Sequence, residues 1–388
     1  MFPMGALNLL FNDAETEFMK VTFVLPTAGL QGGIRVLAIY AERLRRRGHE
    51  VTVVSHPFTM PLRRKVKSLV LGRGWPRIQG SHLDGLGVAH RVLERVRPVV
   101  DADVPDADVV VATYYPTAFS VLNLSRSKGA KAFFIQNYEM EDGKPNPKLD
   151  ATWRMPMHKI VISKWLVQTA KEKYGDGMVS HVPNSVETKQ FHAPPREKRP
   201  FPTVGFLYST SWMKGCRTSL EALKQVATAL PSLRLVCFGA EHPGLDLRLP
   251  RYAEFHYRPQ QDKLRDLYAQ CDVWLCGSAR EGFHLPPLEA MACRCPVVST
   301  RVGGPVDIIE EGVNGHLVDI GDADGLSDRL LRVLNFAQEE WTKMSDAAYS
   351  TAIRFTWDDA TDLFEKALEL AIERDRRGEF SSFREILI

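Results

Sequence analysis

Short apolar runs alternate with amphipathic helical stretches along almost the whole chain, and this alternation restricts the possible folds more than any other feature. The strands predicted in the first half are 21–25, 51–55, 108–112, 131–135 and 159–163. Those predicted in the second half are 203–207, 233–238, 272–276 and 296–299. Strands that are apolar on both faces are typical of parallel sheets covered by helices. The pattern therefore predicts an α/β protein.

A proline-rich segment divides the chain of 388 residues into two halves of ordinary domain size. Four prolines and a cluster of charges in 193–202 argue against regular structure there, so we expect a linker. The domains are then 19–192 and 203–355. Residues 1–18 form an N-terminal extension, and 356–388 form C-terminal helices. A cleft between two such domains is the default binding site.

Composition narrows the class of protein. A hydrophobic content of 44% with 25% charged residues is typical of a globular protein. No apolar run approaches the roughly 20 residues of a membrane-spanning helix, and the acidic N-terminus does not resemble a secretory signal. The six cysteines fit no zinc spacing and are expected to be small buried thiols. A net charge of +3 gives no reason to expect nucleic acid as a partner, and we expect a cytoplasmic protein.

A basic segment at 60–80 carries six Lys or Arg residues and no acidic residue, with apolar side chains interleaved. Such a segment is a candidate for contact with an anionic membrane surface. It would make the protein peripheral on the cytoplasmic face of a membrane. The alternative is a solvated loop, or a helix that packs its apolar side inward.

The segment 278–291 places two carboxylates, Glu281 and Glu289, around a Pro286-Pro287 step after an apolar strand. Proline suits the start of a helix, so Glu289 is expected in the first helical turn. Free N–H groups at a helix start bind phosphate, and carboxylates accept hydrogen bonds from hydroxyls. The alternatives are a helix cap for Glu289 and a surface ion pair for Glu281. The combination indicates a ligand with phosphates and hydroxyls, such as a nucleotide-sugar.

The residues that follow make this motif specific. They comprise the apolar strand 296–299, then Gly303-Gly304, Asp307 and Asn314-Gly315. From Ser278 to Asp319 the chain resembles the retaining glycosyltransferases of family 4, in the group 1 glycosyl transferases, except that His284 stands where the family has glycine.

The resemblance implies a GT-B fold, which consists of two Rossmann-like doubly wound domains that face a cleft. The second domain would hold the nucleotide-sugar donor, the first domain the acceptor, and the C-terminal helices would cross back to the first domain. The implied activity is transfer of a hexose or deoxyhexose from a nucleotide-diphosphate sugar to a hydroxyl of a glycan, glycolipid or lipid-linked acceptor, with retention at the anomeric carbon. We expect neither a cofactor nor a metal.

The site residues follow from the same resemblance. Glu281 and Lys214 are the expected catalytic residues. The expected donor-binding residues are Gly32, Gly33, Gln136, Ser278, Gly282, Phe283, His284, Leu285 and Glu289. Ribose hydroxyls would donate to Glu289, sugar hydroxyls to Glu281, and Lys214 would stabilise the departing diphosphate.

The chain also departs from the family at two positions. Phe206 stands where relatives place a phosphate-binding Arg, for which Arg217 or the hydroxyls of 209–211 are candidate substitutes. Gln136 stands where many relatives have a sugar-contacting His, so a histidine acid at this position is unsupported. These losses keep open a second class of function, a catalytically silent scaffold that binds nucleotide.

Other enzymes are less well supported. Another GT-B enzyme, such as a nucleotide-sugar epimerase or a phosphorylase, is one alternative. A NAD-dependent enzyme is disfavoured, because Gly32-Gly33 does not belong to a Gly-x-Gly-x-x-Gly motif and the second strand ends without an acidic residue. Asp101-Ala-Asp103 has the bare spacing of a metal pair, but we expect a loop there.

Overall fold

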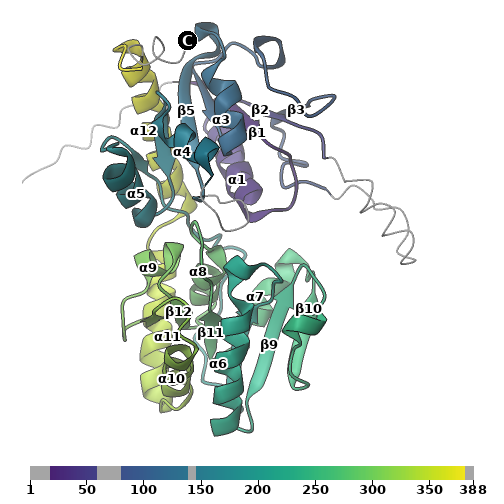
Figure 1. The fold of residues 1–388 in the computed structure, drawn as a ribbon. Helices are drawn as coiled ribbons and strands as arrows, with labels where there is room; N and C mark the ends of the chain where they lie inside the picture. Colours follow the sequence, from purple (N-terminus) through teal and green to yellow (C-terminus); the bar gives the residue numbers. More distant parts are fainter. Residues whose placement is uncertain (1–17, 59–79, 139–145, 381–388) are drawn as a thin grey trace, which may run out of the picture.

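The structure is a computed structural model that describes residues 18–58, 80–138 and 146–380. Within these residues the chain forms two parallel sheets, one in each half, which lie one above the other in Figure 1. The expected α/β architecture with two Rossmann-like domains is thereby confirmed. The exact domain boundaries stay predictions, although 193–202 contains neither helix nor strand.

The first sheet has the strand order β3-β2-β1-β4-β5-β6-β7, and all its pairings are parallel. Its strands are β1 (Lys20–Leu25), β2 (Glu50–Ser55), β3 (Ala89–Val92), β4 (Val109–Ala112), β5 (Ala130–Ile135), β6 (His158–Val161) and β7 (Ser180–His181). The order reverses direction between β1 and β4, the position at which open α/β sheets bind ligands.

The second sheet has the order β10-β9-β8-β11-β12-β13, again parallel throughout. Its strands are β8 (Thr203–Leu207), β9 (Arg234–Gly239), β10 (Ala253–Tyr257), β11 (Val273–Cys276), β12 (Val297–Thr300) and β13 (Gly315–Val318). Here the switch lies between β8 and β11, so the loop after β11 starts at the ligand-binding edge.

Helices connect these strands. Those of the first half are α1 (Gly32–Arg46), α3 (Tyr115–Leu122), α4 (Pro147–Arg154) and α5 (Lys164–Tyr174). Those of the second half are α6 (Cys216–Ala229), α7 (Leu264–Ala269), α8 (Leu285–Ala292), α9 (Gly303–Ile308), α10 (Ala323–Leu334), α11 (Gln338–Ile353) and α12 (Trp357–Arg376). Short 3-10 turns occur at Asp101–Asp103, Arg126–Lys128, Trp212–Lys214, Leu245–Leu247 and Gln261–Lys263.

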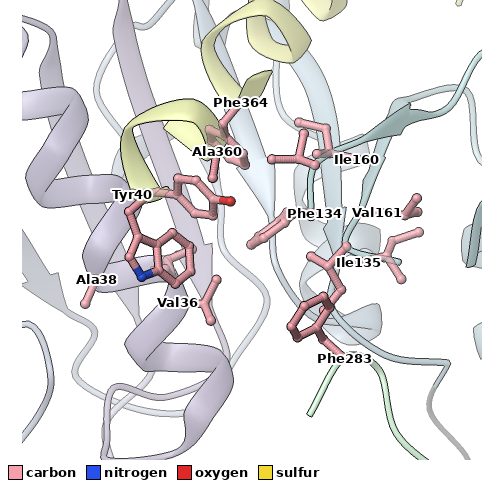
Figure 2. Packing of buried hydrophobic residues seen from close by; sticks show 14 of the residues in the cluster. Val36, Ala38, Tyr40, Phe134, Ile135, Ile160, Val161, Phe283, Ala360 and Phe364 are labelled. Atoms are coloured by element: carbon pink, nitrogen blue, oxygen red, sulfur yellow. The ribbon is translucent and has the colours of Figure 1, made fainter. Parts of the chain in front are cut away.

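The last helix, α12, packs on the first domain although it follows the second in sequence. It lies against α1 and the strands β4, β5 and β6, and Figure 1 shows it rising beside the first sheet. Phe364 stacks on Tyr40 at a centroid distance of 4.3 Å and meets Phe134 edge-on (Figure 2). On this helix Phe364 and Leu368 are buried, whereas Leu363 is exposed.

One hydrophobic core runs through both domains. Phe283, in the loop before α8, belongs to the same buried cluster as Phe134 and Ile135 of β5, and Figure 2 shows it at the edge of that cluster. A second core lies between the second sheet and the helices α6 and α10. All six cysteines are buried and unpaired, as the sequence predicts.

Two sequence predictions fall largely outside the described residues. They are the N-terminal extension, of which 1–17 are not described, and the basic segment 60–80, of which only Gly80 is described. Among the helices that are described, none has the length and apolar character needed to cross a membrane.

Candidate functional site: a cleft between the two domains

A cavity of about 740 Å³ lies between the two sheets. The predicted site residues that line it are Gly32, Gly33, Gln136, Lys214, Glu281, Gly282, Phe283, His284 and Leu285. Two others, Ser278 and Glu289, do not line it. Residues far apart in sequence thus meet in one cleft, because the carboxyl ends of both parallel sheets face each other.

The loop after β11 crosses to the first domain at Gly282. Trp165 of α5 donates its indole N–H to the carbonyl of Gly282 at 2.9 Å. A Cβ on Gly282 would lie 1.8 Å from the carbonyl oxygen of Gln136, so only glycine fits at this contact. The Gln136 amide in turn donates to the carbonyl of Gly33 at 3.0 Å. The loop therefore packs directly on the first domain at Gly282.

Glu281 is the centre of a charged cluster. Its carboxylate lies 2.8 and 3.0 Å from the Lys214 ammonium and accepts a hydrogen bond from the Ser278 hydroxyl at 2.8 Å. Nδ1 of His284 lies 3.1 Å from the same carboxylate. Glu281 is only 8% exposed, so these partners compensate the cost of burying its charge. Ser278 thus acts behind Glu281 rather than in the cleft.

Lys214 reaches Glu281 because the chain turns sharply after the 3-10 turn Trp212–Lys214. Gly215 has φ 57°, and a Cβ there would lie 1.7 Å from the carbonyl oxygen of Gly277. Glycine therefore lets the lysine loop pack directly on the loop after β11. This close backbone approach brings the cation and the carboxylate together.

His284 adopts φ 76°, a left-handed backbone conformation that L residues rarely adopt. It is the N-cap of α8, and its side chain is buried beside Cys276. Burial alone would raise the pKa of the Cys276 thiol, but the neighbouring His284 lowers it below its ordinary value. The family glycine is thus replaced by a strained residue whose ring faces the cluster.

The position expected for Glu289 was wrong. Helix α8 begins at Leu285, so Glu289 is its fifth residue and lies in the second turn. Its carboxylate accepts from Arg35 of α1 at 2.9 Å and from the Tyr268 hydroxyl at 2.8 Å. Burial and the nearby Glu289 raise the pKa of Tyr268, so this hydroxyl stays a donor. Glu289 therefore joins the domains in this structure.

The structure gives no cationic replacement for the missing Arg at the cleft wall among the described residues. Phe206 is buried in the core of the second domain. Arg217 is exposed, and the Thr210 amide and hydroxyl both donate to Glu241. Neither Arg217 nor any of residues 209–211 lines the cleft.

The acidic pair of the first domain is engaged elsewhere. Asp101–Asp103 is a 3-10 turn rather than an irregular loop. Asp103 is buried and accepts from Arg97 at 2.8 Å, which lowers the pKa of the carboxyl to about 2. The pair therefore serves the fold of the first domain.

Sequence reasoning missed several residues of this region, among them Arg35, Asn137 and Asn184. Arg35 bridges to Glu289, while Asn137 and Asn184 line the cleft from the first domain. Asn137 lies two residues after β5, a position that a strand-end search could have found. Arg35 lies on an ordinary helix, and its partner is 254 residues away, so no local pattern marks it.

The fold and the cleft define a class, the GT-B proteins. In agreement with this, Anabaena HepE in complex with UDP and glucose superposes with a TM-score of 0.67 at 16% identity, over 90% of this chain and 99% of that one. Residues 201–335 match the family model described as Glycosyl transferases group 1. This part of the chain is therefore similar to the group 1 glycosyl transferases.

Curated relatives match over shorter segments. D-inositol 3-phosphate glycosyltransferase of Corynebacterium urealyticum is 30% identical over 169 residues, which are 40% of this chain and 40% of that protein. N-acetyl-alpha-D-glucosaminyl L-malate synthase of Bacillus anthracis is 41% identical over 75 residues, 19% of this chain and 20% of that protein. The chain spans less than half the length of these relatives.

Proposed function

We propose that the protein is a retaining glycosyltransferase that moves a hexose or deoxyhexose from a nucleotide-diphosphate sugar to an acceptor hydroxyl. The observation that carries this proposal is the Lys214–Glu281 pair at 2.8 Å in an interdomain cleft. The match of 201–335 to the group 1 family supports it, as does a fold neighbour in complex with UDP and glucose. Retention rests on the resemblance to family 4.

The cleft offers the groups that such a transfer requires. The donor sugar would present hydroxyls to Glu281, and Lys214 would turn from that carboxylate to the diphosphate. The acceptor oxygen forms a bond to the anomeric carbon while the bond from that carbon to the phosphate oxygen breaks. The acceptor proton leaves with the nucleoside diphosphate. Stabilising charge on a leaving group inside a cleft is often the largest catalytic effect.

We also propose that transfer requires no metal or cofactor, because the Lys214 ammonium would neutralise charge on the departing diphosphate. The peripheral contact with a cytoplasmic membrane surface through 60–80 remains part of the proposal. A glycan or lipid-linked acceptor would suit that location.

The test is release of nucleoside diphosphate from a panel of nucleotide-sugars by wild type and Glu281→Gln. Glutamine keeps the shape but loses the charge, and a hydrogen bond to a charged group is worth roughly 1.5–3 kcal/mol. Turnover should therefore fall about 10- to 100-fold, with little change in affinity for the bare nucleoside diphosphate. Glu221→Gln, at an exposed position of α6, is the matched control and should retain wild-type turnover.

Equal rates for wild type and Glu281→Gln would remove Glu281 from the catalytic residues. If wild type binds nucleotide but releases none with any donor, acceptor or water, the protein is instead a silent GT-B scaffold.

A further inference from the structure

The two walls of the cleft differ in charge. Among the described residues that line it, the charged side chains Lys214 and Glu281 both come from the second domain, as does the titratable His284. The first domain contributes neutral polar groups. They are Thr27, Gln31, Thr113, Tyr114, Gln136, Asn137 and Asn184.

Two amide oxygens in this neutral wall are buried without a hydrogen-bond partner among the described residues. They are Oδ1 of Asn137 and Oδ1 of Asn184. Asn137 follows β5, Asn184 follows β7, and both lie at the carboxyl edge of the first sheet. Asn184 is only 5% exposed. Leaving a buried polar atom unpaired is costly, and such atoms in native proteins call for an explanation.

The chemistry of an amide oxygen restricts what can pair with it. It accepts hydrogen bonds and cannot donate them, so its partner must bring an O–H or N–H group. Ionised phosphates and carboxylates only accept, and burying their charge against a neutral wall is unfavourable. A sugar ring presents several neutral hydroxyl donors. Because the described part of this wall has no cation to compensate an anion, it favours a neutral polyhydroxyl ligand over an anionic one.

We propose that the acceptor is a neutral sugar residue, two hydroxyls of which donate to Asn137 and Asn184. The inference rests on the proposed transferase function and specifies the acceptor of the same cleft. It separates this chain from relatives whose names specify inositol 3-phosphate or L-malate, both anions at neutral pH. Asn137 and Asn184 then select the acceptor, while the charged second-domain wall handles the donor.

The first experiment compares matched acceptors with the best donor. A panel of methyl hexopyranosides is assayed beside the corresponding 6-phosphates, inositol phosphate and malate, and nucleoside diphosphate release is measured. We expect kcat/KM for the best neutral glycoside to exceed that of its phosphate at least tenfold. Equal or faster transfer to the phosphate or to malate would overturn the inference.

The second experiment tests the two amides. Asn137→Ala and Asn184→Ala should each raise KM for the neutral acceptor about fivefold or more, a larger change than they cause in KM for the donor. Asn123→Ala, at an exposed asparagine after α3, is the control. Because Asn184 is buried, Asn184→Ala could also destabilise the fold. Asn184→Ser is therefore assayed as well, since serine is smaller but keeps a polar group, and a thermal melt of each variant shows whether it is folded. Unchanged acceptor KM in folded Asn137 and Asn184 variants would refute the assignment.

Failure of this inference is distinguishable from failure of the proposed function. If wild type hydrolyses the donor but prefers anionic acceptors, the proposed transferase function is supported and the neutral acceptor is rejected. If no donor is turned over at all, both fall together.

Discussion

Replacing His284 with glycine gives a test in which a structural role and a functional role predict opposite results. His284 has φ 76°, whereas the family pattern has glycine at this position. A left-handed conformation costs a non-glycine residue about 1–2 kcal/mol. The histidine therefore stays in a conformation that glycine would adopt freely. We expect that the contact between its Nδ1 and the Glu281 carboxylate, at 3.1 Å, offsets the free energy of the backbone strain.

The expected magnitudes follow from the backbone strain at residue 284 and from the contact of its side chain with Glu281. His284→Gly removes about 1–2 kcal/mol of strain but gives the unfolded chain extra freedom worth about 0.4–1 kcal/mol. The backbone terms thus nearly cancel or favour glycine slightly. A charged contact such as that of His284 Nδ1 with the Glu281 carboxylate is worth about 1.5–3 kcal/mol at most. If that contact orients Glu281 during transfer, turnover falls about 10- to 100-fold, while the melting temperature moves by only a few degrees.

The assay measures nucleoside diphosphate release at saturating donor together with thermal unfolding. Arg258→Gly is the matched control, because Arg258 also has positive φ, at 46°, and does not line the cleft. His284→Asn should restore part of the turnover, since asparagine tolerates this backbone and keeps a polar side chain. Full turnover in His284→Gly combined with a raised melting temperature would refute the reasoning and leave His284 as a turn residue.

Three further predictions concern other parts of the chain. Glu289→Ala should weaken nucleoside diphosphate binding about tenfold or more. Arg35→Ala should leave the affinity equal or make it tighter, because Arg35 binds the carboxylate that is proposed to bind the ribose. If calorimetry shows no loss of affinity in Glu289→Ala, Glu289 is only a structural bridge between the domains. Transfer should survive EDTA, and loss of activity that magnesium or manganese restores would contradict the role of Lys214. Burial, reinforced by Arg374, lowers the pKa of His158 to about 4, so the unfolded chain takes up a proton below pH 6.5 that the folded chain refuses. The free energy of unfolding should fall by up to about 3 kcal/mol between pH 6.5 and pH 4, and denaturant titrations should show a smaller fall for His158→Gln.

The fold could be predicted where strands are buried. Strands such as β5 and β12 are apolar on both faces, and their sequences show it. The strands β3, β7, β10 and β13 were missed, and each lies at an edge of its sheet. The first three are partly exposed, whereas β13 is short and buried throughout. An edge strand such as Ala89–Val92 needs no continuous apolar run, so its sequence does not differ from that of a loop.

The site could be predicted where a local motif carries it. The sequence predicts that Glu281 and Lys214, which are 67 residues apart, belong to the same site. In the structure the two side chains are in contact. The Glu289 bridge could not be predicted, because Arg35 belongs to the other domain. The unpaired oxygens of Asn137 and Asn184 depend on how two chain segments bury each other, which a single sequence does not encode locally.

The return of α12 to the first domain affects how the protein is synthesised. Phe364 fills the space beside Tyr40 and Phe134, so the core of the first domain includes residues translated after the whole second domain. Domains generally fold as units while the chain emerges from the ribosome. Here the N-terminal half must emerge with an apolar groove open until the last helix arrives. Nascent chains that end before residue 357 should therefore depend on chaperones more than the full chain does, and a stop codon within α12 should damage the domain translated first.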